Sequence, residues 1–254
     1  MDQISPLVSI VMPVFNSKTY VKESIESIIS QSYTHWELII IDDCSLDNTY
    51  EYLLSEYSDN NKIKILQNSV NSGAGVTRNL GLKNAQGRLI AFLDADDLWL
   101  PEKLAKQVIF MSDNNSAIVH TSYAFINEQG DSIPGRVDVS KQVNLRSYMR
   151  NTEIGMSTSL INKDIVGEFE LHTMRTRQDT RLWLGLLSEG FTANGLNTDL
   201  VLYRVRKGQI SGNKVVIAWR TLKLYLSITN VSLIERLTNF CFYAFNGVFK
   251  RLKR

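Results

Sequence analysis

Apolar residues in the first half of the chain alternate between continuous runs and helical spacing. Continuous, β-branched runs predict buried strands over 7–14, 36–43, 63–68 and 89–94. Between and after them, apolar residues spaced as on one helix face predict helices over 18–31, 73–85 and 101–111. Ser45 or Asp47 is suited to cap a further helix after the second strand. This order predicts an α/β fold, in which a mainly parallel sheet is covered by helices on both faces.

The pattern of the second half is less regular. The run 117–126, a turn at EQGD and the following SIPG predict a hairpin, and 157–166 predicts a strand that passes into a helix. Four large apolar residues mark one face of a helix over 179–190, with Asp179 at its start and Gly190 at its end. No internal repeat or low-complexity linker separates the two halves of the chain.

Polar and turn-forming residues gather where the predicted strands end. They occupy 13–16, 42–43, 68–75 and 94–97. Ligands of open α/β sheets bind beyond the carboxyl ends of the strands, so these segments predict one binding rim. Gly73 and Gly75 are suited to a turn that approaches a phosphate, but position 78 is Arg where a dinucleotide-binding G-x-G-x-x-G motif ends in Gly. The sequence therefore argues against a dinucleotide site.

Composition excludes several classes of protein. Of the 254 residues 44% are hydrophobic and 21% are charged, as in an ordinary globular protein. Cys44 and Cys241 are too few and too far apart to indicate a disulfide framework or a zinc site. The first residues lack the basic segment of a secretory signal, and no window has the roughly 18–20 uninterrupted apolar residues of a membrane span.

Charge is distributed unevenly along the chain. Residues 214–254 carry eight basic side chains and one acidic side chain, so a tail of charge +7 follows a body of charge −5. This tail favours an acidic partner, for which we expect anionic lipid rather than nucleic acid. Apolar residues before the terminal KRLKR recur on one helical face, which is typical of a helix that lies in a membrane surface. These residues are Leu233, Ile234, Leu237, Phe240, Cys241, Ala244, Phe245, Val248 and Phe249. The alternative is a helix packed against its own domain or against a dimer mate.

Five segments occur in the order and spacing of family 2 glycosyltransferases. They are VSIVMPVFN, LIIIDDCSLDNT, NSGAGVTRNLG, LIAFLDADDLWLPEKL and RQDTRLWLGLLSEG, and the resemblance spans about residues 5–212. It implies an inverting bacterial enzyme of GT-A fold. It also implies a nucleotide-sugar-binding half over 1–110 and an acceptor-binding, catalytic half over 111–212, before the basic helical region 213–254. Two residues depart from the family pattern: Cys44 stands where Gly is usual, and Gln178 stands where Glu is common.

The resemblance implies that the acidic segment 94–97 holds a divalent metal, Mn²⁺ or Mg²⁺, together with the diphosphate of the donor. Asp96 is the expected metal ligand, and Asp94 is expected to reach the ribose or a metal-bound water. Ala95 belongs to the same donor-binding segment, and Asp97 is expected to cap the following turn. The alternative is that all three carboxylates are helix caps, although one cap suffices there.

The family also implies the contacts to the nucleoside of the donor. Asp43 is the expected acceptor for the N3–H group of uracil. Pro13 and Phe15 are expected to flank the base or stack on it, and Phe15 replaces a Tyr that is often found there. The alternative for Pro13 and Phe15 is ordinary packing in the core.

Further residues are implied near the diphosphate. We expect Gly73 in the loop that approaches the donor, and Arg78 at the diphosphate or the sugar. Arg204, Arg206 and Lys207 resemble a C-terminal loop that closes over the diphosphate. The alternatives are an exposed helix arginine for Arg78 and a solvated basic turn for 204–207.

Inversion at the anomeric carbon is a single in-line displacement, which requires one base for the acceptor hydroxyl. The family places this base before the LWLGLL helix, at Asp179. A helix N-cap is a further role for Asp179 that is compatible with catalysis. The metal stabilises the departing diphosphate, so the second carboxylate of a glycosidase is unnecessary.

The sequence thus predicts a metal-dependent transferase of a hexose or N-acetylhexosamine from a UDP-sugar to a lipid-linked, undecaprenyl-diphosphate glycan of O-antigen or capsule. We expect a cytoplasmic protein, peripheral on the inner face of the bacterial plasma membrane and able to form a homodimer. One alternative is a nucleotidyltransferase, although VMPVFNSKTY lacks the Gly-rich basic loop usual in that class. Another is a catalytically dead, sugar-binding membrane scaffold, against which the joint presence of Asp43, Asp96 and Asp179 argues.

Overall fold

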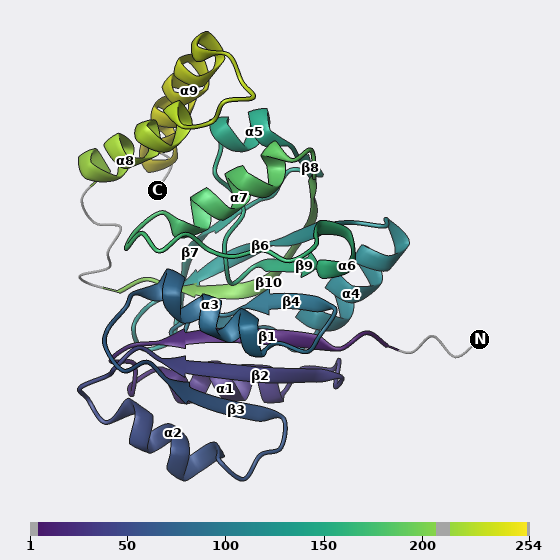
Figure 1. The fold of residues 1–254 in the computed structure, drawn as a ribbon, viewed down its shortest axis with the longest axis vertical. Helices are drawn as coiled ribbons and strands as arrows, with labels where there is room; N and C mark the ends of the chain where they lie inside the picture. Colours follow the sequence, from purple (N-terminus) through teal and green to yellow (C-terminus); the bar gives the residue numbers. More distant parts are fainter. Residues whose placement is uncertain (1–4, 207–213, 253–254) are drawn as a thin grey trace.

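One central sheet organises this computed structural model, which describes residues 5–206 and 214–252 (Figure 1). Its ten described strands are β1 (Val8–Val14), β2 (Trp36–Asp42), β3 (Ile63–Gln67), β4 (Leu89–Phe92), β5 (Leu98–Trp99), β6 (Ile118–Ile126), β7 (Ser132–Val137), β8 (Gln142–Val143), β9 (Ser159–Asn162) and β10 (Ala193–Arg204). They lie in the order β3-β2-β1-β4-β9-β6-β10-β5, with β7 beside β6 and β8 beside β10. Strands β3, β2, β1 and β4 are parallel, as the sequence predicts, whereas β9 is antiparallel to both β4 and β6.

Helices cover both faces of this sheet, which confirms the predicted α/β architecture. They are α1 (Val21–Ile29), α2 (Thr49–Tyr57), α3 (Ala74–Asn84), α4 (Lys103–Asp113), α5 (Leu145–Arg150), α6 (Lys163–Val166), α7 (Gln178–Ser188), α8 (Lys214–Leu226) and α9 (Leu233–Leu252). Alternate residues of a strand point to opposite faces, so β1 contributes to two cores. Ile10 joins a buried cluster with residues of α1, α2 and α4, and Val11 joins one with residues of α5, α7 and α8.

The predicted hairpin is the antiparallel pair β6–β7, and the predicted passage from strand to helix is β9 followed by α6. Asn48, with φ 61°, is the N-cap residue of α2, so neither Ser45 nor Asp47 occupies the predicted cap position. Asp47 Oδ1 nevertheless accepts a hydrogen bond from the backbone N–H of Thr49, the first residue of the helix. Ser45 Oγ and Asp47 Oδ2 accept hydrogen bonds from the backbone N–H groups of Asn16 and Lys18. Both side chains therefore tie the β2–α2 loop to the β1–α1 loop. The short strand β5 was not predicted.

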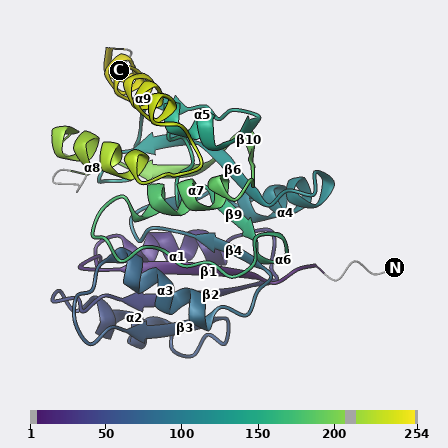
Figure 2. The same cartoon turned by 45° about the horizontal axis from the view of Figure 1, so that its top comes forward.

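Helices α8 and α9 lie beyond α7, on the side of the molecule away from β3 (Figure 2). Helix α9 packs inward through Asn239, Phe240 and Tyr243, and its predicted apolar face is otherwise exposed over the described side chains. Leu233 and Ile234 are 56% and 78% exposed, for example. The side chains of residues 248–252, and residues 253–254 altogether, lie outside the described part. None of the described helices is long and apolar enough to cross a membrane.

Candidate active site

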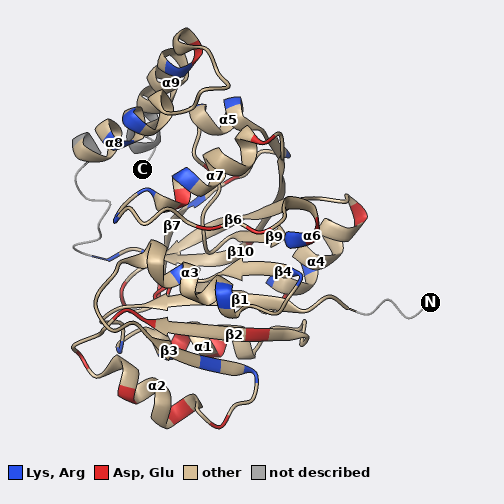
Figure 3. Ribbon diagram, viewed as in Figure 1, with Lys and Arg blue, Asp and Glu red and all other residues tan. Residues whose placement is uncertain are grey.

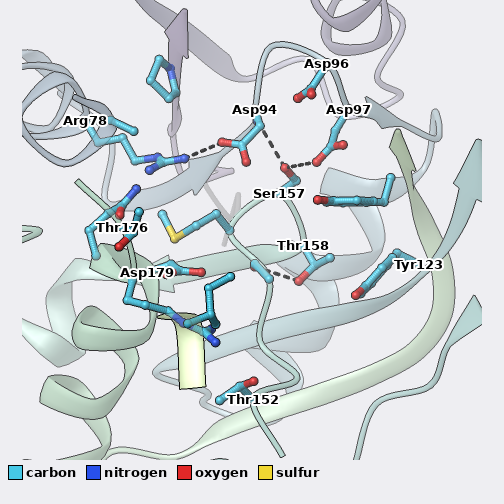
Figure 4. A pocket seen from close by; sticks show the side chains of 18 of the residues that line it. Arg78, Asp94, Asp96, Asp97, Tyr123, Thr152, Ser157, Thr158, Thr176 and Asp179 are labelled. Carbon is cyan, nitrogen blue, oxygen red and sulfur yellow. Dashed lines mark hydrogen bonds and ion pairs between the residues drawn. The ribbon is translucent and has the colours of Figure 1, made fainter. Parts of the chain in front are cut away.

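A cavity of about 1090 Å³ opens beyond the carboxyl ends of β1, β2 and β4. Most of the residues expected at the site line it. They are Pro13, Phe15, Asp43, Arg78, Asp94, Ala95, Asp96 and Asp179. Figure 4 shows Asp179 facing the interior from the side away from Asp96 and Asp97. Gly73 and Arg204 do not line this cavity.

Asp43 is held at the cavity by the loop that follows β3. Its carboxylate accepts hydrogen bonds from Asn68 Nδ2, from the backbone N–H of Ser72 and from that of Gly73, at 2.7–2.8 Å. Gly73 has φ 84°, a conformation that favours glycine, and so directs its N–H at Asp43. A carboxylate has about four acceptor positions, so these three bonds leave room for one more donor. Gly73 therefore acts on the site through Asp43.

Phe15 lies at the cavity beside Asp43 and is 44% exposed, so it is not an ordinary core residue. Pro13, which is half-buried, lines the same wall. Cys44 has φ 62°, in the left-handed region that favours glycine, which gives a physical reason for the Gly usual at this position. The departure at Cys44 thus changes backbone strain rather than a group that faces the cavity.

Arg78 is buried rather than an exposed helix arginine, and it lines the cavity from α3. Its Nη2 atom lies 2.5 Å from Asp94 Oδ1. Its Nε and Nη1 atoms are also buried but have no hydrogen-bond partner in the described part of the chain. Unsatisfied buried donors are costly, and a guanidinium binds phosphate oxygens well. Arg78 is therefore suited to an anionic ligand.

The acidic segment contains carboxylates in three different environments. Asp94 Oδ1 pairs with Arg78, and Asp96 Oδ2 lies 2.6 Å from Arg206 Nη2. Burial and repulsion from Asp94 raise the pKa of Asp96, and Arg206 opposes this rise. Asp97 is buried, and burial with its two acidic neighbours raises its pKa well above the ordinary range. These side chains are therefore not three equivalent charges.

The expectation that Asp97 caps the following turn is wrong. Its Oδ2 atom accepts a 2.6 Å hydrogen bond from Ser157 Oγ, and its Oδ1 atom accepts one from the backbone N–H of Arg204. Ser157 Oγ also accepts a hydrogen bond from the backbone N–H of Asp94. Ser157 was missed at the sequence level, because only the insertion of β9 beside β4 brings it to the acidic segment. Asp97 and Ser157 thus fix the segment that carries Asp94 and Asp96.

Arg204 lies behind the cavity instead of in it. Its buried guanidinium donates to the backbone carbonyl of Asp96 at 2.8 Å and pairs with Glu23 at 2.5 Å. Arg204 therefore holds the backbone of the acidic segment from the side away from the cavity. Arg206, two residues further on, lines the cavity and contacts Asp96. Lys207, the third member of the predicted basic cluster, lies outside the described residues.

The positive partner of the acidic segment in this structure is arginine, whereas the sequence predicted a metal. Asp94 and Asp96 each contact an arginine through one oxygen, so the other carboxylate oxygen of each can still bind a hard cation. Among the described residues no three His, Cys, Asp or Glu side chains form a complete metal cage. A metal bound here would need further oxygens from the ligand. Carboxylates with a diphosphate supply that donor set for Mg²⁺ or Mn²⁺.

Asp179 presents an unpaired carboxylate to the cavity. It is the second residue of α7, whose N-cap residue is Arg177, so the N-cap alternative for Asp179 is wrong. Its side chain is half-buried and accepts one long hydrogen bond, 3.4 Å from Thr180 Oγ1. No basic nitrogen of the described residues lies within the 4 Å of an ion pair. A carboxylate with free lone pairs can receive a proton from a bound hydroxyl.

Solved structures share this fold over most of the chain. TarS of S. aureus (residues 1–349, in complex with UDP-GlcNAc) aligns with a TM-score of 0.73 and 18% identity, covering 93% of this chain and 70% of that one. The mannosyltransferase PcManGT of Pyrobaculum calidifontis, in complex with GDP-Man and Mn²⁺, aligns with a TM-score of 0.70 and 15% identity, covering 96% and 70%. The fold of this chain is therefore the GT-A fold of these glycosyltransferases.

The chain belongs to glycosyl transferase family 2, whose family model matches residues 9–171. TuaG of Bacillus subtilis (strain 168), named for teichuronic acid biosynthesis, is 37% identical over 99% of this chain and 100% of its own length. WfgD of Escherichia coli, named as a UDP-Glc:α-D-GlcNAc-diphosphoundecaprenol β-1,3-glucosyltransferase, is 35% identical over 82% of this chain and 81% of its own. The protein is therefore a glycosyltransferase, as its sequence motifs predicted.

Proposed function

We propose that this protein is an inverting, metal-dependent enzyme that transfers a hexose or N-acetylhexosamine from a UDP-sugar to an undecaprenyl-diphosphate-linked glycan. The observation that carries the proposal is the unpaired carboxylate of Asp179 in the same cavity as Arg78, Asp94 and Asp96. The names of two relatives support it, since WfgD is named for a diphosphoundecaprenol acceptor and TuaG for teichuronic acid biosynthesis. The product would be part of a surface polysaccharide such as O-antigen or capsule.

The contacts to the UDP-sugar follow from the hydrogen-bonding positions of the cavity that have no partner within the described protein. Asp43 has one acceptor position left for the N3–H group of uracil, and Phe15 offers its exposed ring to the base. Arg78 offers its two unsatisfied nitrogens to the diphosphate. A divalent cation, when bound, neutralises charge on the departing diphosphate, and Asp96 and Asp94 would hold it through their free oxygens. Ala95 lines the same wall of the cavity.

The reaction then requires one proton transfer and one displacement. The acceptor hydroxyl gives its proton to Asp179 while its oxygen bonds to the anomeric carbon. The bond from that carbon to the diphosphate breaks on the opposite face, and UDP leaves with the electron pair. Because there is a single displacement, the anomeric configuration inverts. Asp179 needs no second carboxylate as its partner, which fits its isolation from the acidic segment (Figure 4).

Release of UDP by the purified protein tests this proposal. The assay combines UDP-glucose, UDP-galactose or their N-acetyl forms with Mn²⁺ or Mg²⁺ and an N-acetylglucosamine-diphosphate-lipid acceptor. Loss of a general base costs about 10²–10⁴-fold in rate, so Asp179→Asn should reduce kcat by that factor. Glu189→Gln, at the other end of α7, is the matched control and should keep the wild-type rate. Asp96→Ala should abolish the response to added metal.

Three outcomes would contradict the proposal. Full activity of Asp179→Asn would remove the assigned base. Release of pyrophosphate instead of UDP would indicate a nucleotidyltransferase. Binding of UDP without turnover of any donor would indicate a sugar-binding scaffold on a transferase fold.

A lipid-linked acceptor also gives α9 a role, as a helix that lies on the inner face of the plasma membrane. Leu233, Ile234 and Leu237 are exposed on the predicted apolar face, and four basic residues follow at 250–254 in the sequence. The protein should therefore sediment with phosphatidylglycerol vesicles more than with phosphatidylcholine vesicles. Ile234→Glu should weaken this binding, whereas Val70→Glu, an exposed apolar position outside α9, should not. Equal binding of both variants, or a dimer that buries Ile234, would contradict the role.

A further inference from the structure

The cavity continues past Asp179 into a region that the donor does not need. Its lining there comes from Arg150 at the end of α5, from Thr152 just after that helix, and from Tyr243 and Asn246 on α9. In the view of Figure 4, Asp179 lies between Asp94 and Thr152, so this region is on the far side of the expected base from the acidic segment. The acceptor hydroxyl must reach Asp179, and the acceptor therefore has this part of the cavity to occupy.

Two arginines of this region have no acidic partner. Arg150 donates from Nε to Asn239 Oδ1 at 2.8 Å and lies 5.2 Å from the ring of Phe242. Arg177 donates from Nη2 to the hydroxyl of Tyr243, and its buried Nε has no hydrogen-bond partner. Neither guanidinium forms an ion pair with a carboxylate in the described ranges 5–206 and 214–252. Both are thus positioned by α9 through neutral groups.

This arrangement differs from that of the arginines beside the acidic segment. Arg78, Arg204 and Arg206 each contact a carboxylate, at Asp94, Glu23 and Asp96 respectively. Arg175, which also lines the cavity, donates both of its terminal nitrogens to Asn71. An amide oxygen, a phenol and aromatic rings fix the direction of a guanidinium without neutralising its charge. Figure 3 shows basic positions on α5, α7, α8 and α9. The region is therefore prepared for an anion carried by a ligand.

We propose that Arg150 and Arg177 bind the diphosphate of the lipid-linked acceptor. This inference rests on the proposed function, and it names the group by which the acceptor is recognised. Arg177 and Asp179 both line the cavity, so an acceptor whose hydroxyl reaches Asp179 can present the opposite end of its sugar to Arg177. A lipid-linked sugar carries its diphosphate at that end. The lipid would then continue toward α9, whose exposed Leu237 lies outside the cavity.

The length of the acceptor follows from the same arrangement. We expect the preferred acceptor to carry a single sugar between the hydroxyl at Asp179 and the diphosphate at the two arginines, which line the same cavity. The enzyme that supplies this substrate must transfer a sugar phosphate to a lipid phosphate. A glycan of several sugars would place its diphosphate beyond the reach of Arg150 and Arg177.

The test compares two probes that differ in the diphosphate alone. One is N-acetylglucosamine joined through an α-diphosphate to an undecyl chain, and the other is undecyl α-N-acetylglucosaminide. Binding to the full chain is measured by calorimetry with UDP and Mg²⁺ in excess, so that the donor site is filled. A charge-assisted hydrogen bond lost to a buried phosphate costs about tenfold in affinity. We expect the wild type to prefer the diphosphate probe by at least tenfold, and Arg150→Gln or Arg177→Gln to lose most of this preference.

Matched controls lie one turn away on the same helices. Arg146 on α5 pairs with Glu235, and Arg181 on α7 donates to Ser227; neither lines the cavity. Arg146→Gln and Arg181→Gln should keep the preference for the diphosphate probe. In the transfer assay Arg150→Gln should raise the KM for the acceptor about tenfold and leave the KM for the UDP-sugar within about twofold. Because Arg150 is exposed, this variant keeps the test valid if Arg177→Gln fails to fold.

Equal binding of the two probes by the wild type would overturn the inference, as would an unchanged preference in both cavity variants. A preference lost equally in the Arg146→Gln control would also overturn it. The proposed function fails by a different result, namely the absence of UDP release with every donor and acceptor. The calorimetric comparison does not depend on turnover, so the two failures are distinguishable.

Discussion

Lys103 on α4 is a fully buried amine, and its replacement by methionine should stabilise the protein. No carboxylate of the described residues pairs with it, and its Nζ atom lies 3.6 Å from the centroid of the Trp99 ring and 3.5 Å from the Ser159 carbonyl oxygen. Burial lowers the pKa of Lys103 well below its ordinary value. Methionine has a similar length and no charge, so it fills the same space without desolvating an amine.

The size and pH dependence of the effect follow from proton binding. Above the folded pKa and below about 10.4, the unfolded lysine holds a proton that the folded one lacks, so wild-type stability rises with pH. The ionisation cost is at most about 4 kcal/mol at pH 7.5 and about 1 kcal/mol at pH 9.5. The Trp99 ring attracts only the protonated amine, so it raises the folded pKa and thereby lowers this cost by up to about 2 kcal/mol. We expect Lys103→Met to raise the free energy of unfolding by about 1–3 kcal/mol at pH 7.5, and by less at pH 9.5.

Urea unfolding followed by circular dichroism at pH 7.5, 8.5 and 9.5 measures this gain. Lys106→Met is the matched control, because Lys106 lies on the same helix, is exposed and pairs with Glu102. Surface pairs of this kind contribute about 0–1 kcal/mol, so the control should change little. A lower free energy of unfolding for Lys103→Met would refute the reasoning. So would a gain of the same size at pH 7.5 and pH 9.5.

Three further predictions concern the residues around the cavity. Asp97→Ala should lower the free energy of unfolding, measured in urea, by about 2–4 kcal/mol, because it leaves the buried Ser157 hydroxyl and the Arg204 backbone N–H without their acceptor. A change below about 1 kcal/mol would contradict this. Cys44→Gly should raise the melting temperature slightly, because the strain of a left-handed φ costs a non-glycine residue about 1–2 kcal/mol and the extra backbone entropy of glycine costs about 0.5–1 kcal/mol. A lower melting temperature would count against this. The pKa of Asp96 is raised and Arg206 opposes the rise, so kcat/KM should fall on the acid side at a higher pH than for an ordinary aspartate. Arg206→Gln should move that fall to still higher pH. A pH profile unmoved by Arg206→Gln would exclude this coupling.

The parts of the site that could be predicted depend on local signals. Buried strands and amphipathic helices are visible as periods along the chain, and the ends of parallel strands share one edge of a sheet. Those two facts suffice to bring Phe15, Asp43 and Asp94 to one cavity. Asp179 comes from the second half, and the family resemblance rather than periodicity assigned it to the site. Its helix itself was predictable from the spacing of large apolar residues.

The parts that could not be predicted depend on contacts between distant segments. Strand β9 enters antiparallel beside β4, which brings Ser157 to Asp97 across 60 residues of sequence. In the same way, Arg204 and Arg206 differ in role because β10 ends at Arg204, so the alternation of a strand, which would put both side chains on one face, does not extend to Arg206. Sequence spacing does not reveal which of them faces the cavity. Helix α9 shows the same limit, since it packs through Asn239 and Tyr243 and leaves its most apolar face exposed.

Three clustered carboxylates at the end of a buried strand require compensation, and a metal was the predicted source of it. The protein instead compensates Asp94 and Asp96 with arginines and buries Asp97 among hydrogen-bond donors. A cation that binds the free oxygens, Asp94 Oδ2 and Asp96 Oδ1, displaces neither arginine, but it meets carboxylates whose charge Arg78 and Arg206 already offset. The free energy available to cation binding is therefore smaller than the full attraction of two unpaired carboxylates. A diphosphate that brings its own oxygens to the metal supplies what the carboxylates alone do not.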